Sequence, residues 1–492
     1  MYTNNISSLE LRVIVVHAFR PTTRQTTFDF VSSFARHLPS CDVQYLNIFH
    51  PKNEDWKNLS PDIMIVNYDV LNYRFSPLWK YLKNELLELG KNSRFRILLA
   101  QDDFWANELL DDWIIENKID RVLTPIENNL EVLYPRSING REFRTVLTGY
   151  VNPSQANRFK PKQFKDRTID LGQRVRYPSA NLGRYGQEKA RIAERLASLS
   201  KASGFVTDVS TDVNDSKYGQ AWIDFLCDTR FTVSMKGGAS LNDPKGLLYL
   251  RTANFVARNP SASYEEIQEN CLKGVNEDYV FSAISPRLFE AAQARTCQIL
   301  VESDYLGVLE PWVHYIPLKS DFSNSSEVLD AMRDNEQAER IADACYEVLI
   351  ASNDFSDKCL IDAALTDLPK IKSDTGVSSN EAWIKLREHL HDLSFVQENH
   401  SPELSDTLIL WLHDKWMRGG RSELITLKKA ISAPNSISCE NAVDSFLVAT
   451  IRYHSIEAWM GRRIDEANNS QAFSRLVWPW RQLPTELTIE SK

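Results

Sequence analysis

The stretch Leu11-Arg12-Val13-Ile14-Val15-Val16 is short, almost continuously apolar and rich in β-branched residues. Similar apolar runs follow at 62–66, 96–100 and 121–124, and amphipathic stretches lie between the first three runs at 28–37 and 78–89. Apolar strands that alternate with helices are typical of a parallel sheet covered on both faces. The first part of the chain therefore predicts a Rossmann-like α/β lobe.

The same pattern begins again after residues 152–166, a stretch with two prolines, several lysines and little apolar content, where we place an interdomain linker. Strands are expected at 168–171, 231–234 and 298–301, and helices at 187–199, from 287 to 294 and within 327–351. The predicted fold class is α/β, with Rossmann-like doubly wound lobes over 1–155 and 166–352 that face a central cleft. Ligands of such sheets bind outside the carboxyl ends of the strands.

Beyond about residue 366 the strand pattern stops, and apolar residues recur at helical spacing, as in 383–393. We expect residues 353–492 to form a crossover helix and a helical C-terminal extension. Near its end, Trp478 and Trp480 stand beside two arginines. This segment suits peripheral contact with a membrane interface or, as the alternative, aromatic packing of the tail onto the lobes.

The composition of the 492 residues argues against some functions. A net charge of −9 disfavours a broad surface for nucleic acid or anionic membranes, so a phosphate site must be local. The seven cysteines are scattered without a C-x-x-C pair, which is typical of free thiols in a reducing compartment. No apolar window is long enough for a signal sequence or a membrane span. We expect a cytoplasmic protein, at most peripheral to the inner face of the cell membrane.

In the second lobe, the segment Ser285-Pro286-Arg287-Leu288-Phe289-Glu290 has the pattern of a helix start. A serine precedes a proline suited to the first turn, and a basic and an acidic residue follow. Such a helix start can bind phosphate, with Glu290 on ribose hydroxyls. The alternative is a capped helix whose Glu290 only complements the helix dipole. The spacing alone does not decide between them.

Basic residues elsewhere in this lobe are further candidates for phosphate binding. The loop Lys236-Gly237-Gly238 follows a strand, so its backbone can approach a phosphate with Lys236 as the counter-charge. Arg174 and Arg176 follow the first strand of the lobe, and Lys189 lies on the next helix. The alternatives are an ordinary glycine turn and a solvated charged face.

In the first lobe, His17 lies at the carboxyl end of the first strand, with Arg20 close behind it. Asp102 and Asp103 end another strand. His17 and Asp102 are candidates for a general base or for acceptor contacts, and the alternative for His17 is a structural histidine. Adjacent carboxylates of an extended chain point in opposite directions, and no histidine accompanies these two, so we predict no metal.

Residues 284–292, 298–301 and 314–324 together resemble bacterial group 1 glycosyltransferases of the CgeB-like, spore-maturation type. The similarity extends through 222–243, 147–151, 101–103 and 15–17, and so covers roughly residues 10–355. The resemblance implies a GT-B fold, a nucleotide-diphosphate-sugar donor in the second lobe and an acceptor in the first. It also implies transfer without a metal or other cofactor, with retention of configuration.

The resemblance also assigns residues. Glu290 occupies the position of the helix-start glutamate that contacts the donor, with Ser285 and Arg287 beside it. Arg174 or Arg176, with Lys189, are the phosphate-binding candidates, although their spacing departs from the common pattern. Tyr150 joins His17, Asp102 and Arg20 on the acceptor side.

The leading hypothesis is a hexosyltransferase-type enzyme of polysaccharide biosynthesis at the cell envelope. It would move a sugar to a glycan, a lipid-linked saccharide or another cell-surface polymer. The runner-up is a sugar-nucleotide 2-epimerase that uses the same two-lobed site. A third hypothesis, of another class, is a catalytically inactive GT-B-like binding or scaffold protein.

Overall fold

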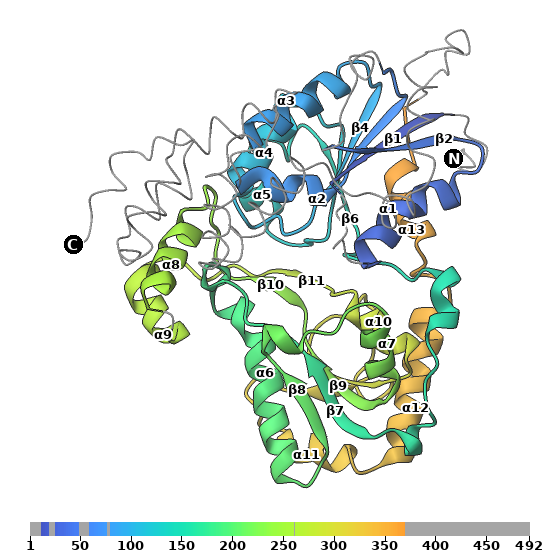
Figure 1. Ribbon diagram of the computed structural model, residues 1–492, viewed down its shortest axis with the longest axis vertical. Helices are drawn as coiled ribbons and strands as arrows, with labels where there is room; N and C mark the ends of the chain where they lie inside the picture. Colours follow the sequence, from blue (N-terminus) through green and yellow to red (C-terminus); the bar gives the residue numbers. More distant parts are fainter. Residues whose placement is uncertain (1–10, 19–24, 49–58, 76–78, 260, 370–492) are drawn as a thin grey trace, which may run out of the picture.

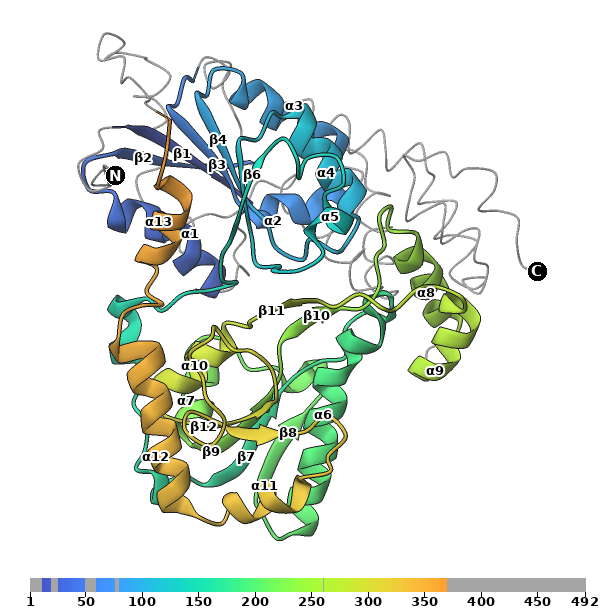
Figure 2. The same cartoon turned by 180° about the vertical axis from the view of Figure 1, so that it is seen from behind.

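The computed structural model describes residues 11–18, 25–48, 59–75, 79–259 and 261–369 and contains two parallel sheets, each in its own lobe (Figures 1 and 2). The six-stranded first sheet has the order β2-β1-β3-β4-β5-β6, and the five-stranded second sheet has the order β13-β12-β9-β7-β8. The predicted α/β architecture of two Rossmann-like lobes is confirmed. The expected helical extension over 370–492, with Trp478 and Trp480, lies outside the described residues.

The strands follow the sequence in alternation with helices. The first sheet comprises β1 (Arg12–His17), β2 (Asp42–Asn47), β3 (Ile63–Val66), β4 (Phe95–Leu99), β5 (Arg121–Thr124) and β6 (Glu142–Thr145). The second comprises β7 (Ile169–Arg174), β8 (Thr207–Ser210), β9 (Thr229–Ser234), β12 (Cys297–Val301) and β13 (Ile316–Leu318). A separate antiparallel ribbon pairs β10 (Gly237–Ala239) with β11 (Phe281–Ala283).

The helices are divided between the lobes. The first part of the chain forms α1 (Gln25–His37), α2 (Tyr68–Leu71), α3 (Trp79–Gly90), α4 (Asn107–Glu116) and α5 (Leu130–Leu133). The second part forms α6 (Gly183–Ala202), α7 (Gln220–Cys227), α8 (Leu247–Arg258), α9 (Tyr264–Ile267), α10 (Arg287–Gln293), α11 (Ser325–Ala331), α12 (Asn335–Tyr346) and α13 (Lys358–Leu365). Short helical segments are η3 (Asn72–Phe75), η4 (Pro153–Arg158), η5 (Phe164–Asp166), η6 (Ala180–Leu182), η7 (Val213–Asp215), η8 (Gln268–Leu272) and η9 (Glu347–Ala351).

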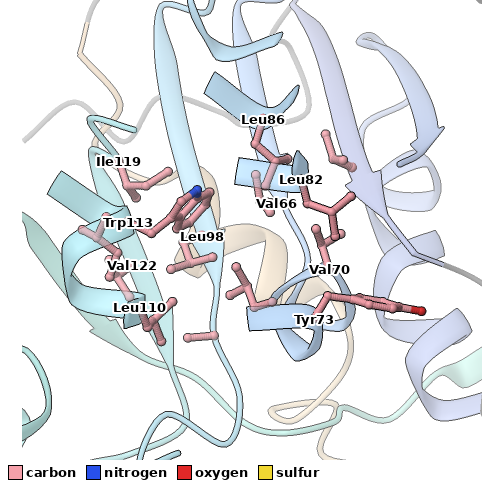
Figure 3. Close-up of a cluster of buried hydrophobic side chains, with 14 of the residues drawn as sticks. Val66, Val70, Tyr73, Leu82, Leu86, Leu98, Leu110, Trp113, Ile119 and Val122 are labelled. Carbon is pink, nitrogen blue, oxygen red and sulfur yellow. The ribbon is translucent and has the colours of Figure 1, made fainter. Parts of the chain in front are cut away.

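The apolar strand β1 is covered on both faces, as its continuous apolar run predicts. Alternate side chains of a strand point to opposite faces, so Ile14 and Val16 join one hydrophobic cluster while Val13 and Val15 join another. Figure 3 shows the first cluster, in which Leu82 and Leu86 of α3 and Leu110 and Trp113 of α4 pack on the sheet. The opposite face is covered by α1 and α13.

Within the described residues, the linker that follows β6 and the segment that leads to α13 cross between the lobes side by side. The backbone N–H of Val151 donates to the carbonyl of Phe355 (2.9 Å), and the N–H of Asp357 donates to the carbonyl of Val151 (2.9 Å). The buried Asp357 carboxylate then accepts hydrogen bonds from Arg36 (2.6 Å) and His37 (2.7 Å) of α1. These contacts anchor the returning chain, so that α13 packs on the first lobe.

A second connection joins the lobes through the segment 235–283, which runs from the end of β9 to the end of β11. The N–H of Ala106 donates to the carbonyl of Asp243, and the N–H of Glu108 donates to that of Pro244, both at 3.0 Å. Phe281 belongs to the first-lobe core and stacks on Phe104, with ring centroids 6.4 Å apart. Both views place α8 and α9 on the side away from α13 (Figures 1 and 2).

Candidate functional site

The carboxyl ends of the two sheets face each other. Lys236 follows β9, and its Nζ lies 3.7 Å from the carboxylate of Glu127, which follows β5. Thr148, which follows β6, donates its hydroxyl hydrogen to the carbonyl of Ile284 (2.5 Å), just after β11. The ends of parallel strands are where ligands of such sheets bind, so a ligand site is expected at these ends.

The predicted helix start at residue 287 forms helix α10. Ser285 Oγ accepts a hydrogen bond from the N–H of Arg287 (3.4 Å). The preceding turn packs closely on the first lobe, since a Cβ added to Gly149 would lie 3.0 Å from two ring carbons of Pro286. The first-lobe segment with Thr148 and Gly149 thus fixes the place where α10 begins.

Glu290 and Arg287 share one neighbour, Trp222, in the first turn of α7. The indole Nε1–H of Trp222 donates to Glu290 Oε2 at 2.7 Å. The guanidinium of Arg287 lies over the Trp222 ring, 4.6 Å from its centroid. Arg287 also donates to Gln173 Oε1 (3.1 Å) and to the carbonyl of Arg174 at the end of β7. Arg287 is therefore held between α7 and the carboxyl end of β7.

Three cations lie close enough to shift the pKa of Glu290. Burial raises this pKa, and the Trp222 hydrogen bond, Arg287, Arg158 and Lys189 oppose the rise. The pKa of Lys189 falls to about 7, chiefly through burial and also through the neighbouring Arg287 guanidinium, while Glu290 acts in the opposite direction. A bound polyanion would favour the charged form of Lys189. We use the name carboxyl-edge cluster for Lys189, Arg287, Glu290, Trp222 and Arg158.

The two other arginine candidates of this lobe differ: Arg174 makes contacts within the lobe, and Arg176 is exposed. Arg174 donates from Nη2 to the Asp208 carboxylate (2.6 Å) and from Nη1 to the Asp208 carbonyl (2.7 Å), and it lies 4.6 Å above the Phe225 ring. Arg174 thereby ties β7 to β8. Arg176 is exposed.

The glycine loop serves the connection between the lobes. Lys236 is buried and pairs with Glu127, and Gly237 and Gly238 form the ribbon strand β10. Gly238 has φ +151°, and a Cβ there would lie 1.8 Å from the carbonyl oxygen of Phe281. Close backbone pairing in the ribbon therefore requires glycine at this position.

The acceptor-side candidates of the first lobe lie at or near the ends of its strands. His17 is buried as the last residue of β1 and meets the Tyr45 ring edge-on, with centroids 6.5 Å apart. Asp102 is exposed, with φ +53°. Tyr150 is half-buried, and its hydroxyl oxygen accepts from the N–H of Leu147 (3.1 Å). Arg20 lies outside the described residues.

Asp103, next to Asp102, points into the protein. It accepts hydrogen bonds from Tyr134 (2.6 Å) and Thr124, and burial raises its pKa. Among the described residues, no group of three or more His, Cys, Asp or Glu side chains is placed to hold a metal ion. No helix in the same part of the chain is both long and apolar enough to cross a membrane.

Sequence reasoning missed two members of the carboxyl-edge cluster. Trp222 lies within the stretch 222–243 of the family resemblance, but only the fold reveals its contact with Glu290, 68 residues away. Arg158 belongs to the linker, at the end of η4, and its guanidinium contacts Gln155 and Gln220. A single arginine in a polar linker gives no local sign of a ligand site.

Comparison with known proteins finds similarity at the level of structure alone. No protein-family pattern matches the sequence, and no curated protein matches it. An α-glucosyltransferase in complex with UDP and a 13-mer DNA containing an HMU base is 10% identical, with a TM-score of 0.42 over 72% of this chain and 97% of that one. Anabaena HepE in complex with UDP-glucose is 8% identical (TM-score 0.38; 72% and 98%). A glycosyltransferase from Rickettsia africae is 9% identical (TM-score 0.38; 80% and 100%).

Proposed function

We propose that this protein is a GT-B-type glycosyltransferase. It binds a nucleotide-diphosphate sugar at the carboxyl edge of the second sheet and transfers the sugar to a glycan, a lipid-linked saccharide or another cell-surface polymer. The observation that carries this proposal is the carboxyl-edge cluster, in which Trp222 contacts both Arg287 and the Glu290 carboxylate, while Lys189 and Arg158 act electrostatically on that carboxylate. It lies where ligands of Rossmann-like sheets bind.

The side chains of the cluster suit the charges of the reaction. When the bond between sugar and diphosphate breaks, negative charge grows on the departing phosphates, and fixed cations such as Arg287 and Lys189 stabilise it. An ionised glutamate has only acceptor oxygens, so Glu290 is suited to bind the hydroxyls of the ribose or of the sugar. The cluster thus offers separate partners for the charged and the hydroxyl parts of a donor.

The acceptor would bind on the opposite lobe, near the ends of β1 and β4, where His17 and Asp102 lie. We propose metal-independent transfer with retention, in which the departing phosphate assists attack from the same face of the sugar. Such a mechanism requires no pair of protein carboxylates. The protein would act in the cytoplasm, at most as a peripheral protein of the inner face of the cell membrane.

Nucleotide release tests the proposed activity. The protein is incubated with UDP-, GDP-, ADP- and dTDP-sugars, with and without cell-envelope extracts, and the released nucleoside diphosphate is measured. One of the donors should give release that increases when acceptor is present. If no donor gives more nucleotide release than the blank, the proposed glycosyltransferase activity is wrong. Formation of the 2-epimer instead of a glycoside would identify the epimerase alternative, and donor binding without turnover would identify the scaffold.

The variant Glu290→Ala tests the site. We expect donor turnover to fall at least about tenfold, or ~1.4 kcal/mol, because the carboxylate that receives the hydroxyls is lost. The matched control is Glu269→Ala, which removes an exposed glutamate of the same lobe that pairs only locally with Lys273. Unchanged donor affinity and turnover in a folded Glu290→Ala protein would contradict the assignment.

A further inference from the structure

We propose that Trp222 is a positioning residue of the donor site, which holds the Glu290 carboxylate and the Arg287 guanidinium in one fixed arrangement. The proposal rests on the function proposed above. Trp222 lies on α7 and contacts both Glu290 and Arg287, the two residues of α10 that are proposed to bind the donor.

The geometry of Trp222 is that of a rigid support. Trp222 is 8% exposed, and its ring stacks on Phe225 with centroids 5.6 Å apart. Its edge donates the Nε1–H to Glu290 (2.7 Å), and its face carries the Arg287 guanidinium at 4.6 Å. An aromatic face attracts a cation, and an indole N–H is a donor only. One buried side chain therefore fixes a cation and a carboxylate at the same time.

The contact is also selective for the ionised form of Glu290. A hydrogen bond donated to a carboxylate favours its charged state, whereas burial disfavours it. The charged groups that face Glu290 are Arg287 on its own helix, Lys189 on α6 and Arg158 on η4, and all of them act in the same direction as Trp222. Trp222 adds a fixed direction, because its N–H points at one carboxylate oxygen.

The first experiment follows the indole N–H resonance of Trp222 by NMR in the full-length protein. The resonance is assigned through its loss in Trp222→Phe. We expect it to shift with a pH midpoint above the ordinary glutamate pKa of 4.5, since burial raises the pKa of Glu290. The shift should vanish in Glu290→Gln. A resonance that responds neither to pH nor to Glu290→Gln would overturn the proposal, whether or not a donor binds.

The second experiment measures UDP affinity by calorimetry. Trp222→Phe keeps the ring beneath Arg287 and against Phe225 but removes the donor to Glu290. We expect about tenfold weaker binding, as for the loss of a hydrogen bond to a charged group. In a Glu290→Gln background the same change should add little, because the two residues act through one contact. Trp312→Phe, on another part of the lobe, serves as the control.

The two experiments separate the possible failures. An equal loss of affinity from Trp222→Phe in both backgrounds would overturn the positioning role, because a merely structural tryptophan gives additive effects. A wild-type protein that binds none of the nucleotides would refute the proposed function. In that case the NMR titration alone still decides whether Trp222 affects the ionisation state of Glu290.

Discussion

Lys189 should change its charge near neutral pH. Its pKa of about 7 in the free protein is lowered from 10.5 by burial and by Arg287, and a bound diphosphate would raise it again. The lysine is therefore charged below about pH 7 and neutral above it. Above pH 7, binding of a diphosphate must be accompanied by protonation of Lys189. UDP affinity should fall by up to about tenfold per pH unit between about pH 7 and pH 9.

Calorimetry across that pH range checks the prediction for Lys189. Lys189→Arg is the matched control, since arginine stays charged at every pH used, and its UDP affinity should change little with pH. An identical pH slope in the wild-type and Lys189→Arg proteins would show that another group titrates.

Arg158 brings the interlobe linker to the proposed donor site. It is half-buried at the end of η4 and helps to stabilise the charged form of Glu290. We expect Arg158→Ala to weaken UDP binding by several-fold, about 1 kcal/mol, as for the loss of one partly solvated cation. Lys201→Ala removes an exposed cation at the far end of α6 and should leave UDP affinity unchanged. Equal affinities of the two variants would place Arg158 outside the site.

The sequence predicted part of the candidate site, residue by residue. Lys189, Arg287 and Glu290 were named from helix-start chemistry and family resemblance, and the fold brings them together. Arg174 is an equally attractive charge at the end of a strand, but its guanidinium donates to Asp208 of β8 and to the carbonyls of Asp215 and Gln173. The rotamer and the neighbouring strand decide which of several basic residues can contact a ligand. Local sequence spacing predicts neither of them.

At the scale of elements, the sequence predicted central strands and missed edge strands. The buried strands β1, β3, β4, β5, β7, β9 and β12 all correspond to predicted runs. The strands β2, β6, β8 and β13 were not predicted, and they form the four edges of the two sheets. The edge strand β6 (Glu142–Thr145) is partly solvated and carries polar residues, whereas β13 (Ile316–Leu318) is buried but only three residues long and contains a proline. Without a continuous apolar run, such a strand resembles a loop.

The ribbon β10–β11 is an element whose stability can be tested at a single glycine. Gly238→Ala would place a Cβ 1.8 Å from the Phe281 carbonyl oxygen, so the ribbon would have to separate. We expect a loss of about 2–3 kcal/mol in the free energy of unfolding, measured in urea. Gly274→Ala is the matched control, because its φ is also positive (+78°) but no atom lies within 4 Å of the added Cβ. Similar losses in both variants would assign the effect to backbone strain alone.

At the scale of the whole molecule, the lobes are joined on two sides. Val151 and Asp357 pair where the chain crosses, and on the side of α8 and α9 the segment 235–283 bonds to the first lobe. A two-lobed architecture was predicted from the repeated strand and helix pattern. This second connection was not, because the segment 235–283 lies between elements of the second lobe in the sequence while its Phe281 packs in the core of the first.

Because the lobes are connected on two sides, the polypeptide could be cut in the linker while the two fragments stay associated. A protease site inserted between Lys160 and Pro161, two exposed residues of the linker, would cut the chain into fragments of 160 and 332 residues. The larger fragment still carries both α13 and Phe281 into the core of the first lobe. After cleavage the fragments should co-elute in size-exclusion chromatography as one particle, and their separation would contradict this expectation. The nicked protein would then be a natural starting point for a split protein, assembled from two separately made halves.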